Sequence, residues 1–185
     1  MNSPTSQNIM RRMWLLYGLM MVGAWWVWVP LGLPGSRPAW LALGWGMAVA
    51  TFLIGITVGA SRWLTTKTQW GRRMEEALAE ALPLLNQRQV LILAMLSSVG
   101  EEIVFRGVLQ PRLGLWVATL LFGLLHVPLK RVLLPWTLFA LLMGLVLGLL
   151  TEWSGHLWPA IWLHFGVNYL NLGSMSRRHP LKKNA

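Results

Sequence analysis

The stretch VLLPWTLFALLMGLVLGLLT, residues 132–151, decides the fold class because it holds 20 consecutive residues without a charged side chain. A helix needs about 20 apolar residues to cross roughly 30 Å of hydrocarbon, so this stretch has the length and composition of a membrane span. The whole chain agrees with it, since 55% of its 185 residues are hydrophobic and only 12% are charged. A soluble domain carries about twice that share of charge. The sequence therefore predicts an integral membrane protein.

Other apolar stretches extend this reading to an all-α, polytopic transmembrane bundle of about six spans. The expected spans are residues 13–33, 39–60, 89–111, 115–128, 132–151 and 157–173. The first is too long for the apolar core of a secretory signal and has no clear cleavage site behind it, so we expect it to be retained. Because no repeat divides the chain, we expect a single domain, 1–185, with a motif-bearing core at 89–173.

The positive charge of the chain follows a membrane topology. Of the 16 Lys and Arg residues, 13 flank the expected spans on the side of the N-terminus, two (Arg37 and Arg112) lie on the other side, and Arg106 lies within a span. Lys and Arg are enriched on the cytoplasmic side, so we expect both termini inside, in a multi-pass protein of the cell membrane, as in a bacterial inner membrane. The net charge of +10 then favours the lipid bilayer and not nucleic acid as a partner.

Between the second and third expected spans lies the polar stretch SRWLTTKTQWGRRMEEALAEALPLLNQRQ. Met74, Leu78, Ala81 and Leu85 recur in it at helical spacing, which predicts an amphipathic helix lying at the membrane surface. A solvated loop is the alternative reading. Within the spans, Gly107, Gly114, Gly123 and Gly166 are expected to be close-packing positions between helices.

Ionisable residues gather inside the third expected span, which reads SSVGEEIVFRGVLQPRL over residues 97–113. Such residues cost several kcal/mol in hydrocarbon and persist where they are paired or functional. On a helix Glu102 and Arg106 are neighbours one turn apart and suit an ion pair, while Glu101 points about 100° away from Glu102. One carboxylate is therefore expected to be paired and the other to be available as a general base.

Two further spans contribute imidazoles and an amide. Phe122 and His126 lie one turn apart on the fourth span, and His164 and Asn168 have the same relation on the sixth. Counting about 1.5 Å per residue from the outer ends, Glu101, His126 and Asn168 come out at a similar depth, with His164 about one turn closer to the outside. Each residue alone could be a structural contact, and Glu102 with Arg106 a structural ion pair, but the shared depth favours catalysis or transport.

The ordered set Glu101-Glu102-x-x-x-Arg106, Phe122-x-x-x-His126 and His164-x-x-x-Asn168 resembles the CAAX prenyl protease 2 and bacteriocin-processing (CPBP, or Abi) family. This resemblance implies an intramembrane endopeptidase. Glu101 and His126 would activate the attacking water, His164 and Asn168 would hold the oxyanion, and Glu102 and Arg106 would brace the site. The implied substrate is a peptide or membrane protein, prenylated in the eukaryotic relatives. The alternatives are a non-catalytic immunity or regulatory protein on the same scaffold and, less favoured without visible inverted repeats, a proton-coupled transporter.

The sequence does not decide whether the site uses a metal. The family is usually labelled as metalloprotease, and Glu101, His126 and His164 together are a legitimate ligand set for zinc with a water in the fourth position. The chain has no His-Glu-x-x-His motif, however, and no Cys that could ligate a metal or act as a nucleophile. A metal-free glutamate protease would use the same side chains.

Overall fold

The computed structural model describes residues 4–27, 39–81, 85–128 and 131–178, and every regular element in these ranges is a helix. The all-α prediction is thus confirmed. The helices, in order, are α1 (Pro4–Val27), α2 (Ala39–Lys67), α3 (Gln69–Ala81), α4 (Gln87–Glu102), the π-helix η1 (Ile103–Leu109), α5 (Gln110–Leu113), α6 (Leu115–Leu125), the 3-10 turn η2 (Arg131–Leu133), α7 (Leu134–Ser154) and α8 (Trp158–Arg178).

Each expected span has a helical counterpart, although the helices do not all meet the criterion for a span. Two are long and apolar enough to cross a membrane by length and composition, Trp40–Lys67 and Arg131–Ser154, while Leu115–Leu125 is apolar but shorter. The count of six spans therefore stays a prediction. The first expected span, 13–33, lies within α1 as far as Val27, although that helix begins nine residues earlier, at Pro4. Its expected end, 28–33, lies outside the described residues.

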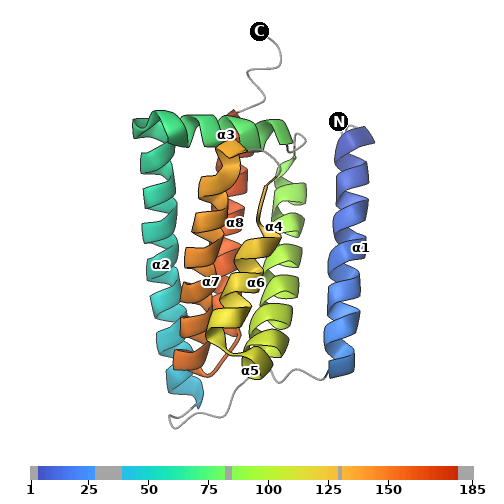
Figure 1. Ribbon diagram of the computed structural model, residues 1–185, viewed down its shortest axis with the longest axis vertical. Coiled ribbons are helices and arrows are strands. Elements are labelled where there is room, and N and C mark those ends of the chain that lie inside the picture. The colour runs from blue at the N-terminus through green and yellow to red at the C-terminus, as the bar shows by residue number, and fades with distance from the viewer. Residues whose placement is uncertain (1–3, 28–38, 82–84, 129–130, 179–185) are drawn as a thin grey trace.

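The long helices run alternately up and down one bundle, with α3 lying across one end (Figure 1). In Figure 1, α2 and α8 end at the α3 end of the bundle, α1, α4 and α7 begin there, and the shorter α6 runs toward it but ends partway along the bundle. The following basic residues belong to these ends or to α3: Lys67, Arg72, Arg73, Arg88, Arg131, Arg177 and Arg178. This arrangement agrees with the charge distribution read from the sequence. Which side of a membrane the α3 end faces stays a prediction, and Arg37 lies outside the described residues.

The polar stretch after α2 forms a helix and not a loop. On α3, Met74 and Leu78 are half-buried and Ala77 is buried, as an amphipathic helix requires. The far end of α8 is tied to this helix by an ion pair between Arg178 Nη1 and Glu75 Oε2 at 3.2 Å. The helix is therefore confirmed, while its place at a membrane surface remains a prediction.

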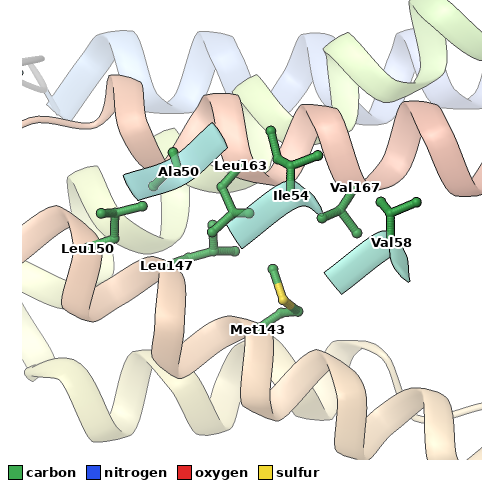
Figure 2. Packing of buried hydrophobic residues seen from close by; sticks show 9 residues of the cluster. Ala50, Ile54, Val58, Met143, Leu147, Leu150, Leu163 and Val167 are labelled. Atoms are coloured by element: carbon green, nitrogen blue, oxygen red, sulfur yellow. The ribbon is translucent and has the colours of Figure 1, made fainter. Parts of the chain in front are cut away.

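The main apolar core lies where α2, α7 and α8 meet (Figure 2). Ala50 and Ile54 of α2 pack there with Leu147 of α7 and with Leu163 and Val167 of α8. Large apolar side chains also cover the outside of the bundle, with Leu19, Phe52, Leu120 and Leu138 among the exposed residues. An apolar exterior around an apolar core is expected of a helix bundle surrounded by lipid.

Gly123 and Gly166 lie at close contacts between helices, as expected. A Cβ at Gly123 would clash with the side chain of Leu141, and a Cβ at Gly166 would clash with that of Ile54. Gly114 does not fit the expectation, because no atom lies within 4 Å of the place that a Cβ would take. Its φ of 83° explains the glycine instead, since this residue makes the turn between α5 and α6 in a conformation that other residues rarely adopt.

Substituting Gly166 with alanine is expected to lower the free energy of unfolding by about 1–3 kcal/mol, because the added methyl overpacks the contact between α8 and α2. Gly55→Ala is the matched control, since no atom lies within 4 Å of its Cβ position. Unfolding in mixed micelles, followed by the fluorescence of the 13 Trp residues, measures both changes. Equal stability of the two variants would contradict the close α2–α8 packing.

Candidate active site

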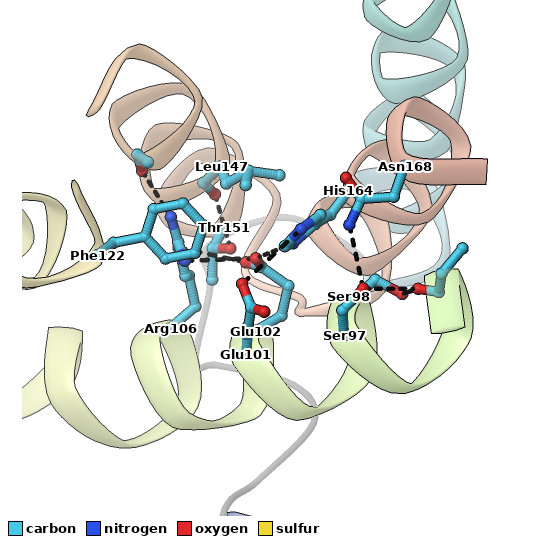
Figure 3. Close-up of polar contacts among 12 residues, drawn as sticks. Ser97, Ser98, Glu101, Glu102, Arg106, Phe122, Leu147, Thr151, His164 and Asn168 are labelled. Atoms are coloured by element: carbon cyan, nitrogen blue, oxygen red, sulfur yellow. Dashed lines mark hydrogen bonds and ion pairs between the residues drawn. The ribbon is translucent and has the colours of Figure 1, made fainter. Parts of the chain in front are cut away.

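The site is organised around a buried ion pair between Glu102 and Arg106 (Figure 3). Arg106 Nε lies 3.2 Å from Glu102 Oε2, and Arg106 Nη1 donates to Glu102 Oε1 at 3.3 Å. The side chains are 0% and 1% exposed for Glu102 and Arg106 respectively. Two charges so deeply removed from water are tolerated only because each satisfies the other. The expected pairing of these two residues is confirmed.

Arg106 also ties this helix to α7. Its Nη2 donates to the backbone oxygen of Gly144 at 2.9 Å, and one turn further along, Gln110 Nε2 donates to the oxygen of Gly148 at 3.1 Å. Gly148 leaves room for Gln110, since a Cβ there would lie 2.8 Å from Gln110 Oε1, and a Cβ at Gly144 would lie 3.2 Å from the ring of Phe122. The guanidinium carbon of Arg106 lies 4.5 Å from the centre of the Phe122 ring, a cation–π contact.

The helix that carries both glutamates changes its winding within the site. α4 ends at Glu102, and the π-helix η1 follows directly from Ile103 to Leu109 before α5 continues. Long π-helices are rare, and single π turns inside α-helices are frequent at functional sites. The sequence pattern did not predict this element, because apolar periodicity over seven residues does not distinguish a π-helix from an α-helix.

Glu101 lies at the centre of the remaining polar groups. Its Oε1 accepts a hydrogen bond from the hydroxyl of Tyr17 at 2.8 Å. Its Oε2 is buried and has no hydrogen-bond partner among the described residues, and it lies 3.9 Å from Nε2 of both His126 and His164. The expectation of one paired and one available carboxylate is therefore confirmed, with Oε2 as the available atom.

His126 is brought to Glu101 by the end of α6. Val127 and Pro128 follow it, and because proline disfavours helix at the preceding residue, α6 stops at Leu125 with His126 as its C-cap. His126 Nδ1 lies 2.7 Å from the backbone oxygen of Phe122. Since a carbonyl only accepts, Nδ1 carries the proton, and in the neutral ring Nε2 is an acceptor facing Glu101.

His164 approaches the glutamates from α8. Its Nδ1 lies 2.8 Å from Glu102 Oε1, and because an ionised carboxylate only accepts, this nitrogen donates. Its Nε2 is thereby directed to Glu101. Glu102 thus fixes the orientations of Arg106 and His164 together, and the ring of His164 is buried.

Asn168 lies one helical turn from the level that the sequence predicted for it. Its Nδ2 donates to Ser97 Oγ at 3.0 Å, so it is level with the α4 turn before Glu101, while His164 is level with the glutamates. The predicted level followed from a rise of about 1.5 Å per residue throughout. The wider winding of η1 over seven residues brings Glu101 closer to the outer end and accounts for part of this difference.

Phe122 links the charged and imidazole parts of the site. Its buried ring stands edge-on to Phe105 with centroids 5.0 Å apart and lies 4.7 Å from the ring of His126. It also covers the Arg106 guanidinium. The aromatic residue one turn before His126 therefore excludes water from the ion pair and fixes the imidazole plane.

Three contributors to the site were not predicted from the sequence: Tyr17, Ser97 and Gln110. Ser97 and Gln110 stand four residues before Glu101 and four after Arg106, so a search for polar residues along the same helix face would have found them. Tyr17 belongs to a different helix, α1, and no spacing connects it to Glu101.

The described residues contain no group of three or more His, Cys, Asp or Glu side chains placed to hold a metal ion. The Nδ1 atoms of both imidazoles are engaged by oxygen acceptors, so the Nε2 atoms, each 3.9 Å from Glu101 Oε2, are the nitrogens that face the site. The hypothesis of a metal held by Glu101, His126 and His164 receives no support from the described residues and stays a prediction.

A buried pair of glutamates on one helix, with imidazoles delivered to them from two other helices, makes this cluster the candidate functional site of the described residues. Residues 84–170 match the family described as type II CAAX prenyl endopeptidase Rce1-like. The chain therefore carries a domain of the Rce1-like CAAX endopeptidase family, and the resemblance read from the motifs is confirmed. Glu101, Glu102, Arg106, His126 and His164 all lie within the matched region, as does Asn168.

A region of 81 residues is 40% identical to the uncharacterized protein YpbD of Bacillus subtilis (strain 168). The similarity covers 43% of this chain and 41% of that relative, so the chain spans well under two thirds of its length. No solved structure matches the chain.

Proposed function

We propose that this protein is an intramembrane endopeptidase in which Glu101 activates a water molecule for attack on a peptide bond. The observation that carries the proposal is the position of Glu101 Oε2, which is buried, has no hydrogen-bond partner among the described residues and lies 3.9 Å from two imidazole nitrogens. The endopeptidase family supports the same reaction class.

Glu101 and His126 share the task of taking a proton from the water. A water bound to Oε2 can reach His126 Nε2 as well, because a separation of 3.9 Å is spanned by two hydrogen bonds of about 2.8 Å meeting at one atom. His126 Nε2 accepts, since its Nδ1 proton is held by the Phe122 carbonyl. The imidazole can then pass the proton to the leaving amine, as peptide hydrolysis requires.

His164 and Asn168 supply donors to the oxyanion. Glu101 and Glu102 carry two negative charges against the one positive charge of Arg106, and a proton on His164 neutralises the cluster in its apolar surroundings. A protonated His164 donates from Nδ1 to Glu102 and from Nε2 into the site. Asn168 gives one Nδ2 proton to Ser97 and keeps the other for the substrate. Donors aimed at developing charge are the largest contribution to most acyl-transfer catalysis.

The substrate is a peptide or a membrane protein whose scissile bond reaches the level of Glu101 inside the bundle. Prenylation of that substrate is a further feature to be tested, because the family description names prenyl endopeptidases. No step of the proposed reaction requires a metal, because Glu101 and His126 take the proton from the water.

The proposal is tested by incubating the detergent-purified protein with quenched fluorescent peptides, using farnesylated CAAX peptides and identical peptides without the lipid. Cleavage that persists in the presence of 1,10-phenanthroline is the expected result. Cleavage abolished by the chelator and restored by zinc would overturn the metal-free mechanism. No cleavage of any peptide by a folded protein would favour the non-catalytic reading of the same scaffold.

A further inference from the structure

The hydroxyl of Tyr17 makes the one direct hydrogen bond to the Glu101 carboxylate that the described residues provide. Tyr17 belongs to α1, outside the matched region of residues 84–170. Its donation to Oε1 at 2.8 Å fixes the orientation of the Glu101 carboxylate. A carboxylate held at one oxygen cannot rotate freely, so its other oxygen, Oε2, stays directed to the nitrogens of His126 and His164.

The ring of Tyr17 is fixed by packing on both sides. It is 7% exposed and belongs to an apolar cluster with Val90 and Leu93 of α4, against which Tyr169 of α8 also packs. Gly100, the residue before Glu101, lies under the ring, since a Cβ there would be 2.9 Å from Tyr17 Cδ1. A rotamer locked by packing holds its hydroxyl where a carboxylate can be oriented by it.

We infer that Tyr17 is a positioning residue for the proposed hydrolysis, holding the Glu101 carboxylate so that Oε2 faces the attacking water. The inference rests on the proposed function. It assigns α1 a part in the site that the matched region does not contain. Tyr17 does not touch the reacting atoms in this scheme and acts through Glu101 alone.

Replacing Tyr17 with phenylalanine tests the role in catalysis, because the ring and its packing remain while the donor is lost. We expect kcat to fall about tenfold, the effect of one charge-assisted hydrogen bond, with KM changed by less than about twofold. Tyr169→Phe is the matched control, since Tyr169 is the other tyrosine of the chain and stacks on Phe165. Its kcat is expected to equal that of the wild type.

A second measurement tests the contact without relying on activity. Because the chain has two tyrosines, incorporation of 3-fluorotyrosine gives two ¹⁹F resonances, and Tyr169→Phe assigns them. The Tyr17 resonance is expected to shift in Glu101→Ala, while the Tyr169 resonance stays in place.

The outcomes of these two experiments separate the positioning role of Tyr17 from the proposed endopeptidase function. If the chemical shift of the Tyr17 resonance does not change in Glu101→Ala, or if Tyr17→Phe is active with an unchanged kcat, the positioning role alone is overturned. A wild type that cleaves no peptide overturns the proposed function and the positioning role with it, even where the resonance shifts. A shift together with a fall in kcat at constant KM supports the inference.

Discussion

Replacing Glu101 with glutamine is expected to lower kcat by about 10²- to 10⁴-fold, the range found when a general base is removed. Glutamine keeps the size of the side chain and an oxygen that can accept from Tyr17. It cannot accept a proton from the water that we place between Oε2 and His126. Initial rates on the peptide that the wild type cleaves best measure the change.

The control for this loss of kcat is Glu75, a carboxylate outside the site at one end of the bundle. Glu75 lies on α3 and pairs with Arg178, so Glu75→Gln removes one charge of the same kind outside the site and is expected to keep wild-type kcat. The thermal unfolding of both variants in detergent should stay close to that of the wild type. A Glu101→Gln enzyme with more than about a tenth of the wild-type rate would exclude Glu101 as the base.

The helices could be predicted from the sequence because an apolar run of about 20 residues indicates a membrane-spanning helix. The expected span 132–151 lies within α7 and its preceding turn, and 157–173 lies almost entirely within α8. The ends were less certain, and the first helix begins nine residues before the expected span 13–33. Hydropathy places the middle of a helix well, whereas its ends depend on polar residues that continue the helix outside the apolar region.

The pairing inside the site could also be predicted, because it is local. Glu102 and Arg106 lie one turn apart, so helix geometry alone brings them together, and it separates Glu101 from both. The level of Asn168 could not be predicted, because the residue count assumed straight α-helices with matched outer ends, whereas the π-helix η1 lies between Glu101 and the outer end of its helix. Tyr17 could not be predicted either, since its contact with Glu101 spans 84 positions and arises only from the packing of α1 on α4.

Replacing Arg106 with methionine is expected to lower the free energy of unfolding by about 3–5 kcal/mol, the cost of leaving one partner of a buried ion pair uncompensated. Methionine fills much of the same space beside Phe122. The carboxylate of Glu102 remains at 0% exposure without its guanidinium partner. Unfolding in mixed micelles by added sodium dodecyl sulfate, followed by tryptophan fluorescence, measures the difference.

The double variant Glu102→Gln with Arg106→Met separates the charge from the packing. It contains no unpaired carboxylate at position 102, and the glutamine oxygen can still accept from His164 Nδ1. We therefore expect it to recover more than half of the stability that Arg106→Met loses, as replaced buried pairs often do. If the double variant were as unstable as the single one, the loss would come from the missing bond to the Gly144 carbonyl and from packing. Glu102 and Arg106 would then hold α7 in place rather than balance each other's charge.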